Sequence, residues 1–568
     1  ERGWWNDFDP TVMIDDDGTP WMSWGNGTCF LVKLKKNMVE LDGEIMVLPM
    51  ENYVEGPWLY KRDGHYYNVY ASMGFPLETI SYAMADNIEG PWTFMGELTG
   101  MAKDSFTIHP GVIDFKGKTY LFYHNSTLSL DGYGPATGRR SVCVDEMFYN
   151  PDGTIKPVVQ TRAGIKTLKP AEKGAFETRS YRNVFVEAGY FPEQVDAKVN
   201  QVFEEVFFGP DKVYFEVGDS LAYISDIKNN DVRTEGMSYG MMIAVQMDRK
   251  DIFDNIFRWC KKYMQHTDGP YEGYFAWSCK TDGTRNSQGP ASDGELYYVT
   301  SLLFASNRWG NDTGIDYKAE AQYILDCAFA KNDTTKINNF INTEHKLITF
   351  TPDQFGYTFT DPSYHIPAFY EVWAKWADDG RSDFWMECAK ASREYLHKAV
   401  HEQTGLNSDY SNYDGSIRMY NGSHFGTGNF RYDSWRVPMN IAMDYSWSCA
   451  DKQWQREYGE KIQRFFYEQG INDFVDQYRI DGTLPSEDEI LPAGSWGKAL
   501  RHSVGLVSTL GAASLLTDHA INKEFVDALW NSENKPYEDG YFDAYYDGLL
   551  RLFAFMHLSG KYQIIFPE

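Results

Sequence analysis

Apolar and polar positions change their spacing once along this chain. Up to about residue 170, pairs of apolar stretches are joined by short polar turns that contain glycine. Three such units occur, at Pro10–Gly25, Trp58–Ala71 and Gly111–His124. Two apolar stretches around a tight turn are typical of a β-hairpin. Because the units recur about every 50 residues, they predict about three blades of a β-propeller.

Beyond about residue 175 the apolar positions follow helical spacing. Val195, Val199, Val202 and Val206 share one helix face after Pro192. Further helix-like segments begin near residues 234, 250, 293, 315, 364, 383, 434, 453, 498, 521 and 543. About twelve helices joined by long loops fit a double ring of helices, the (α/α)6 barrel. We therefore predict a multidomain chain, with a partial β-propeller at residues 1–168, a polar linker at 169–180 and an all-α barrel at 181–568.

Composition narrows the possible partners. Aromatic residues make up 16% of the 568 residues, which fits rings that stack on sugars, although a large core also uses such residues. The formal net charge of −28 argues against nucleic acid and anionic membranes as partners. No run of 18 apolar residues occurs, so we expect no membrane span.

The cysteines indicate a reducing environment. There are seven, an odd number, scattered along the chain without a CxxC pair. This pattern favours buried thiols over disulfides or a zinc site. We therefore expect a cytoplasmic protein without a secretion signal. A periplasmic protein is the alternative, because the chain begins at Glu1 and a removed signal would leave the same pattern.

Three short motifs place acidic residues among aromatic and small ones. Each acid lies at or near the start of a helix-like segment. The motifs are Thr234–Met241, Pro290–Glu295 and Phe430–Arg436. Hydrolysis of a glycosidic bond needs one acid to protonate the leaving oxygen and a second group to activate water. Glu235, Asp293 and Asp433 are therefore the candidate carboxyl groups.

The three motifs occur in the order found in glycoside hydrolase family 8. From Tyr181 onwards the chain resembles that family, and within it the reducing-end xylose-releasing exo-oligoxylanases. The resemblance implies that Glu235 is the general acid and Asp433 the general base of an inverting reaction. Such a reaction needs the two carboxyl groups roughly 6.5–9.5 Å apart. The structural alternatives are a glutamate stabilised by the helix dipole and an N-cap aspartate.

The same resemblance implies residues that bind the sugar. Asp293 would hold the sugar next to the cleaved bond, and Tyr364 would help to place that sugar and the water. Trp277, Tyr298 and Trp435 are candidate stacking platforms, with a core role equally open.

A loop that carries a histidine closes one end of the cleft in the exo-acting relatives. His502 is the best match and would contact the free reducing-end xylose. The alternative is an ordinary exposed histidine at a helix start.

Residues 1 to about 165 resemble part of glycoside hydrolase family 43. Asp9 matches the carboxylate that tunes the acid, Glu55 the general acid and His109 a central histidine that often approaches a cation or water. Arg140 is expected to face the same pocket. No residue matches the general base of that family, so we expect an incomplete site.

Together these features predict an O-glycosyl hydrolase. We expect it to release xylose from the reducing end of β-1,4-xylo-oligosaccharides with inversion, beside an incomplete arabinofuranosidase or xylosidase domain. The substrate is the expected partner, and the mechanism requires no cofactor or metal. An endo-acting family 8 xylanase, β-glucanase or chitosanase stays open, as does a non-catalytic xylan-binding protein.

Overall fold

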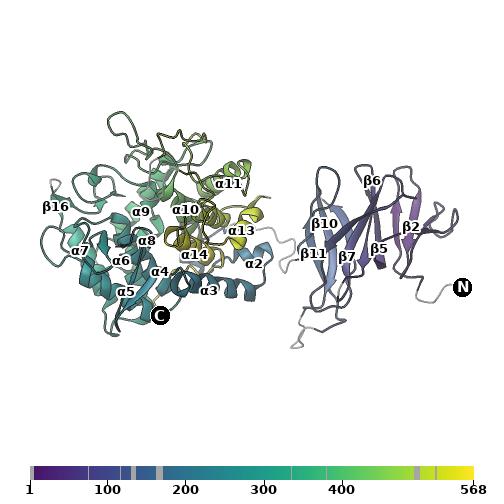
Figure 1. Ribbon diagram of the computed structural model, residues 1–568, viewed down its shortest axis with the longest axis horizontal. Coiled ribbons are helices and arrows are strands. Elements are labelled where there is room, and N and C mark those ends of the chain that lie inside the picture. The colour runs from purple at the N-terminus through teal and green to yellow at the C-terminus, as the bar shows by residue number, and fades with distance from the viewer. Residues whose placement is uncertain are drawn as a thin grey trace. The chain divides into compact units, whose positions relative to one another are not determined.

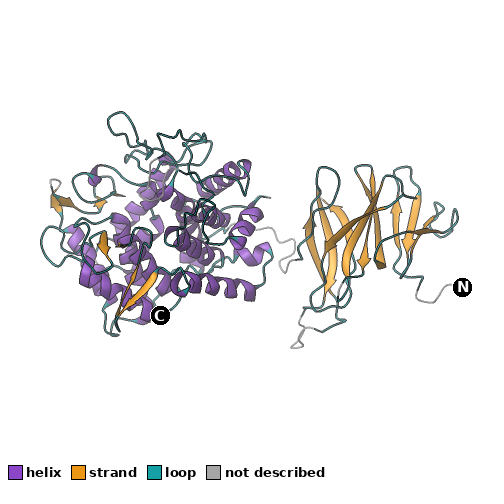
Figure 2. Ribbon diagram, viewed as in Figure 1, coloured by secondary structure: helices purple, strands orange, loops and turns teal. Residues whose placement is uncertain are grey.

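The structure is a computed structural model that describes residues 6–74, 76–115, 117–128, 136–160, 171–333, 336–378, 380–490, 499–518 and 521–567. Contacts divide the chain into two compact units. They are Glu1–Thr167 with Val186–Phe191, and Leu168–Phe185 with Pro192–Glu568. The first is rich in strands and the second in helices (Figure 1, Figure 2), which confirms the predicted change from strands to helices.

The strand-rich unit consists of three antiparallel sheets, with strand orders β1-β2-β3-β4, β5-β6-β7-β8 and β11-β10-β9. Each sheet uses strands that are consecutive in the chain, because short turns join them. The strands are β1 Thr11–Ile14, β2 Pro20–Trp24, β3 Cys29–Lys33, β4 Met46–Leu48, β5 Tyr53–Arg62, β6 His65–Ser72, β7 Thr79–Ala85, β8 Thr93–Thr99, β9 Gly111–Phe115, β10 Lys118–Asn125 and β11 Ser141–Met147. The three predicted hairpins are confirmed as β1-β2, β5-β6 and β9-β10.

The sheets of this unit pack face to face. One apolar core joins the first two sheets through Leu31 and Leu59, and another joins the second and third through Val69 and Leu121. The outer faces of the first and third sheets expose apolar side chains instead. These are Val12, Ile14 and Val47 on one face, and Phe115, Phe122 and Val142 on the other.

Fourteen α-helices lie among the described residues. They are α1 Ala175–Thr178, α2 Val184–Ala188, α3 Pro192–Phe208, α4 Thr234–Gln246, α5 Lys250–Trp259, α6 Ser292–Trp309, α7 Tyr317–Phe329, α8 Pro367–Trp376, α9 Ser382–Ala399, α10 Arg436–Trp447, α11 Lys452–Glu468, α12 Val504–Ala512, α13 Asn522–Asn531 and α14 Tyr546–Leu558. The predicted start near residue 498 falls on a segment outside the described residues, and α12 follows it. The 3-10 turns η3 Pro362–Tyr364 and η4 Tyr432–Trp435 precede α8 and α10.

Short strand pairs complete the helical unit. They are β12 Tyr214–Val217 with β13 Leu221–Ile224, β14 Asp231–Arg233 with β15 Ser278–Lys280, β16 Asn332–Asp333 with β17 Ile337–Asn338, and β18 Ile341–Asn342 with β19 Leu347–Ile348.

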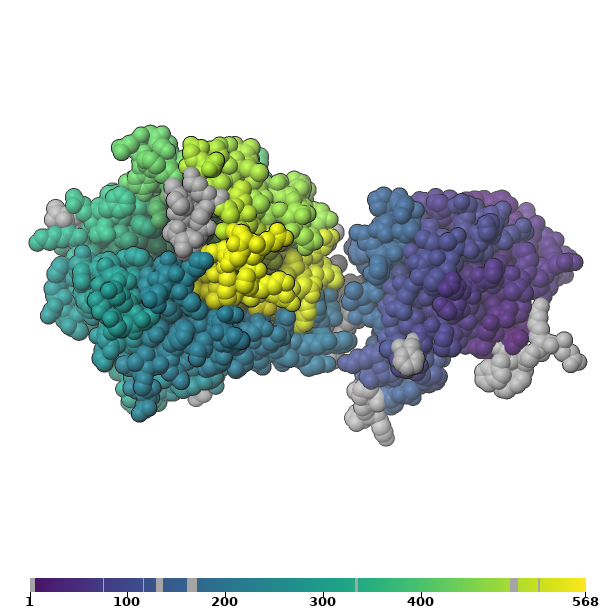
Figure 3. Space-filling view, in the orientation of Figure 1, coloured from purple at the N-terminus to yellow at the C-terminus, as the bar shows by residue number. Residues whose placement is uncertain are grey.

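The even-numbered helices from α4 to α14 pack on one another in succession, and α14 returns to α4. Each of them also packs on an odd-numbered helix, as α4 does on α5 and α14 on α3. Nearly every residue of α4 and α14 is buried, whereas α5 and α11 bury one face. A helix that is buried all round lies inside a fold, and an amphipathic helix covers it. In Figure 3 the blue surface from the first part of this unit and the yellow surface from its last part lie side by side. Beneath the surface, α3 packs on α14.

Two further expectations can be compared with the structure. All seven cysteines are free thiols; four are buried, as predicted, whereas Cys143, Cys327 and Cys449 are partly exposed. No helix in the described part of the chain is both long and apolar enough to cross a membrane.

Candidate active site

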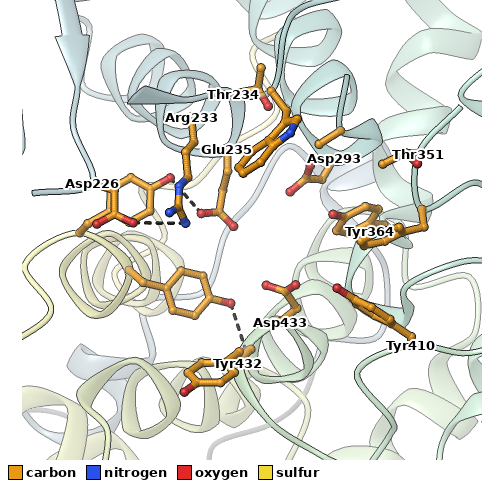
Figure 4. A pocket seen from close by; sticks show the side chains of 15 residues that line it. Asp226, Arg233, Thr234, Glu235, Asp293, Thr351, Tyr364, Tyr410, Tyr432 and Asp433 are labelled. Atoms are coloured by element: carbon orange, nitrogen blue, oxygen red, sulfur yellow. Dashed lines mark hydrogen bonds and ion pairs between the residues drawn. The ribbon is translucent and has the colours of Figure 1, made fainter. Parts of the chain in front are cut away.

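A pocket of about 370 Å³ opens where the N-terminal ends of several helices meet. Its lining comes from α4, α6, the start of α14, the turns η3 and η4, and the loops beside them (Figure 4). The lining residues are Asp226, Arg233, Thr234, Glu235, Trp277, Ala291, Asp293, Phe350, Thr351, Tyr364, Tyr410, Tyr432, Asp433, Tyr545 and Tyr546. A few polar groups on largely aromatic walls are typical of a small-molecule site.

The three predicted acids meet in this pocket. Glu235 is the second residue of α4, Asp293 is the second residue of α6, and Asp433 lies in η4. Figure 4 shows Glu235 and Asp433 on opposite sides of the pocket, with their carboxylates pointing toward one another. Free backbone N–H groups at a helix N-terminus favour negative charge, so this placement suits carboxylates.

One guanidinium joins the three acids. Arg436 Nη1 donates to Glu235 Oε2 at 2.9 Å and lies 3.3 Å from Asp293 Oδ2, while Nη2 lies 2.9 Å from Asp433 Oδ1. Nη1 also donates to the Tyr239 hydroxyl at 2.9 Å. The Arg436 side chain is only 4% exposed, so it arranges the carboxylates from behind the pocket wall. Sequence reasoning missed this role, although the i, i+3 spacing from Asp433 places both residues on one side of a helical turn.

The surroundings of Glu235 hold a proton on it near neutral pH. Burial raises the pKa of Glu235 to about 7; the charges of Asp293 and Asp433 add to the shift, and Arg436 opposes it. The Tyr545 hydroxyl donates to Glu235 Oε1 at 2.9 Å and fixes the carboxyl group. The Asp433 side chain is 29% exposed, compared with 18% for Glu235. The two carboxyl groups therefore lie in different surroundings, which general acid–base chemistry requires.

Burial also raises the pKa of Asp293, while Arg436 opposes that shift. Its Oδ1 accepts a hydrogen bond from the Gly294 backbone N–H at 2.9 Å. Tyr364 lies beside it in the pocket lining, at the end of η3. Both predicted sugar-binding residues thus face the same space as Glu235.

The three predicted stacking platforms differ in how exposed their rings are. Trp277 lines the pocket and is 39% exposed, so its ring is available to a ligand. Tyr298 is completely buried, with its ring 4.3 Å from Phe275, and is a core residue. Trp435 is 3% exposed and donates to the Asp476 carbonyl. Neither Tyr298 nor Trp435 has an open ring face, so the stacking expectation for these two is corrected.

In the described part of the chain, His502 lies outside this pocket. Its ring packs 4.3 Å from Phe474, and Nδ1 donates to the Phe474 carbonyl at 2.8 Å. It lines a different cavity, together with Asn472 and Glu524. The hydrogen bond and the ring contact that hold His502 account for this placement.

Several pocket residues carry no signal in the sequence motifs. Arg233 pairs with Asp226 at 3.2 Å, and its guanidinium lies 5.8 Å from the Trp277 ring centre. The Tyr546 hydroxyl donates to the Tyr432 carbonyl at 3.0 Å. Trp277, Tyr432 and Tyr546 come from segments distant from Arg233, so only the folded chain brings them together.

The strand-rich unit holds the second group of predicted residues. His109 Nε2 lies 2.8 Å from Glu55 Oε1, and His109 Nδ1 lies 3.9 Å from Asp9 Oδ2. Gly56 permits this contact, because a Cβ there would lie 3.0 Å from His109 Nδ1. Arg140 donates to the Thr107 hydroxyl at 3.4 Å. Ligand atoms of Asp9, Glu55 and His109 lie within 4.8 Å of one another, a spacing that could hold a cation.

The charges and hydrogen bonds around Glu55 do not suit the role of a general acid. The hydrogen bond with His109 lowers the pKa of Glu55, although burial opposes this. Burial lowers the pKa of His109, but contacts with Glu55 and Asp9 outweigh burial and raise it overall. A lowered pKa makes Glu55 a poorer proton donor near neutral pH.

Comparisons with known proteins agree with both resemblances. Residues 223–557 match the model of glycosyl hydrolases family 8, and residues 2–155 match that of glycosyl hydrolases family 43. Both resemblances found in the sequence are confirmed.

Two of three individual relatives are exo-oligoxylanases of similar length to the matched part of the chain, and the third is a different glycosidase. A reducing end xylose-releasing exo-oligoxylanase from Halalkalibacterium halodurans is 44% identical over 406 residues, covering 71% of this chain and 98% of that protein. The structure of Rex8A from Paenibacillus barcinonensis complexed with xylose is 39% identical, with a TM-score of 0.62 and coverage of 69% of this chain and 99% of that chain. A beta-D-galactofuranosidase from Aspergillus niger is 31% identical over 166 residues, covering 28% of this chain and 48% of that protein.

Proposed function

The chain belongs to the glycosyl hydrolases of family 8, and we propose that it releases xylose from the reducing end of β-1,4-xylo-oligosaccharides with inversion. The observation that carries this proposal is the placement of Glu235 and Asp433 across one pocket, on the two terminal nitrogens of Arg436. The exo-acting relatives supply the substrate class and the end of the chain that is attacked.

Glu235 acts as the general acid. Its pKa of about 7 keeps a proton available at neutral pH, and the Tyr545 hydroxyl orients the carboxyl group. The proton passes to the glycosidic oxygen as the bond to the anomeric carbon breaks, which leaves a free xylose on the reducing-end side.

Asp433 acts as the general base. It takes a proton from a water that attacks the anomeric carbon from the opposite face. Both carboxylates contact one guanidinium at 2.9 Å, so their bound oxygens are at most about 8 Å apart. This limit is compatible with the roughly 6.5–9.5 Å that an inverting site needs for its water. Asp293 and Tyr364 hold the sugar between them, and Trp277 offers a stacking face.

We also infer two architectural details. The succession of even-numbered helices that returns to α4, each with an odd-numbered neighbour, supports an (α/α)6 barrel. The three stacked sheets support three blades of a propeller, whose outer faces lack neighbouring blades. The strand-rich unit is then an incomplete family 43 domain without a working site, and the lowered pKa of Glu55 fits this.

The seven free thiols favour the cytoplasm.

Xylotriose labelled at its reducing end tests the function. The expected products are labelled xylose and unlabelled xylobiose, and proton NMR of the fresh product should show the inverted anomer. Glu235→Gln is the matched control and should give neither product. Mixed oligomers from long xylan would indicate an endo-acting enzyme instead, and binding without cleavage would indicate a non-catalytic protein.

A further inference from the structure

Three aspartates form a cluster on the Asp433 side of the pocket. One carboxylate oxygen from each of Asp361, Asp409 and Asp433 lies within 4.8 Å of the other two. Asp361 immediately precedes η3, and Asp409 lies in the loop between α9 and η4. Asp361 is completely buried and Asp409 is 2% exposed, whereas Asp433 faces the pocket. Three negative charges this close in a buried site repel one another strongly.

Two of these carboxylates are paired with arginines. Arg431 Nε donates to Asp409 Oδ2 at 3.1 Å, and Arg436 Nη2 lies 2.9 Å from Asp433 Oδ1. Within the described ranges no cationic side chain pairs with Asp361. Its Oδ1 accepts from the Ser363 backbone N–H at 2.7 Å, and its buried Oδ2 has no hydrogen-bond partner there.

Protonation of Asp361 removes the repulsion among the three carboxylates with the smallest loss of favourable charge contacts. Burial and then the charge of Asp433 raise the pKa of Asp361 well above its ordinary value, against the effect of Arg436. Burial also raises the pKa of Asp409, to about 7, but Arg431 opposes this directly. A divalent cation would relieve the repulsion too, but it would lie beside two guanidinium groups. Because Oδ1 of Asp361 already accepts a hydrogen bond, the proton belongs on Oδ2.

We propose that Asp361 stays protonated through the catalytic cycle and, as a neutral carboxylic acid, directs its proton at the Asp433 carboxylate and positions it. This inference rests on the proposed role of Asp433 as the general base. A neutral donor stabilises the ionised form of a neighbouring carboxylate, whereas a second anion would destabilise it. Asp361 is thus a positioning residue that acts through Asp433 and not on the sugar.

Asp361→Asn and Asp361→Ala test whether Asp361 acts as a neutral donor or as an anion. The amide of D361N is neutral, has the same shape and can place its N–H₂ where Oδ2 lies. We expect D361N to keep kcat/KM for xylotriose within about threefold of the wild-type value and to leave the acidic limb of the pH profile in place. D361A should lower kcat by about 10²-fold with little change in KM, and should move the acidic limb to higher pH, because Asp433 loses the donor that favours its ionised form.

Two kinetic results would overturn the proposal. A shift of the acidic limb to lower pH in D361N would mean that wild-type Asp361 is an anion. A loss of kcat in D361N as large as that in D361A, with both proteins folded by circular dichroism, would mean that the negative charge is needed. If D361A does not fold, Asp361→Ser takes its place beside D361N. Activity lost with EDTA and restored by Ca²⁺ would assign the cluster to a cation and also overturn it.

An infrared measurement decides the same point without any substrate. The difference spectrum between wild type and D361N at pH 7 should contain the C=O band of a protonated carboxyl group in the wild type. A carboxylate band in its place contradicts the proposal. If the wild type released no xylose from xylotriose, the proposed function would fail, but this spectrum would still report the protonation of Asp361.

Discussion

At the scale of single residues, the site depends on a side chain that does not line the pocket. Arg436 is 4% exposed, yet it contacts Glu235, Asp293 and Asp433 at once. A planar guanidinium offers several donors in a fixed fork, which a flexible lysine cannot reproduce. The relative placement of acid and base is therefore set by one buried cation.

The alkaline limb of activity should report Glu235. Because the pKa of the folded protein's Glu235 is raised to about 7, kcat/KM should fall as the pH rises through about 7, where the acid loses its proton. Glu235→Gln should lower kcat by about 10²–10⁴-fold. Glu295→Gln is the matched control, because burial raises the pKa of Glu295 to about 8 but this residue does not line the pocket. A displaced alkaline limb in E295Q would contradict the assignment.

Arg436→Lys should lower kcat by about 10²-fold, because one ammonium group cannot hold all three carboxylates that the guanidinium contacts. Arg436→Ala should also lower the free energy of unfolding by about 3–5 kcal/mol, since it leaves buried charges unpaired. Urea unfolding and kcat measured together test both effects. Arg393→Lys serves as the control, because Arg393 pairs with Glu371 and Asp444 away from the pocket. Equal losses of kcat in the two lysine variants would contradict a special role for Arg436.

At the scale of elements, the helix starts bring the chemistry together. α4 and α6 each place an acid at their second position, and η4 places Asp433 just before α10. α4 packs directly on α6, and α10 packs on α8, which in turn packs on α6, so this packing fixes the distances between the helix ends. Close packing at small residues then sets how the start of α14 meets α4.

Gly236 tests this packing. A Cβ at this position would lie 2.4 Å from Tyr545 Cε2, so Gly236→Ala must displace the ring that donates to Glu235. We expect kcat to fall about tenfold or more. Gly240→Ala, one turn later on α4, meets Ile224 at 2.7 Å and should lower the melting temperature without a comparable loss of kcat. If both variants lose only stability, the Tyr545 contact does not matter for activity.

At the scale of the whole molecule, the two units differ in how complete their sites are. The helical unit gathers Glu235, Asp433 and a largely aromatic wall in one pocket. In the strand-rich unit the hydrogen bond with His109 lowers the pKa of Glu55, and two apolar sheet faces are exposed. Activity should therefore come from the helical unit alone.

Two variants of the full chain separate the contributions. Glu55→Gln should leave xylose release from xylotriose within about twofold of the wild-type rate, because the helical site does not use it. Glu235→Gln should abolish that release and leave no hydrolysis of aryl arabinosides or aryl xylosides. Turnover of an aryl arabinoside at enzymatic rates in the E235Q chain would contradict an incomplete strand-rich unit.

The sequence determined the local features of this protein. Hairpins follow from alternating apolar stretches around tight turns, and most helix starts follow from apolar spacing, so β1-β2, α4 and α6 were predictable. The acids Glu235, Asp293 and Asp433 were found because their motifs are local and resemble a known family. Both kinds of information lie within short segments of chain.

Only the tertiary structure decided which side chains share a space. Tyr298 and Trp435 turned out to be core residues, and His502 lies against Phe474, because burial depends on neighbours far away in the sequence. Arg436 begins α10, and Asp361, Asp409 and Asp433 come together from separate loops and turns. Apart from the i, i+3 pair of Asp433 and Arg436, these charges interact over a few ångströms between segments that are far apart in the chain, so local spacing does not encode their distances.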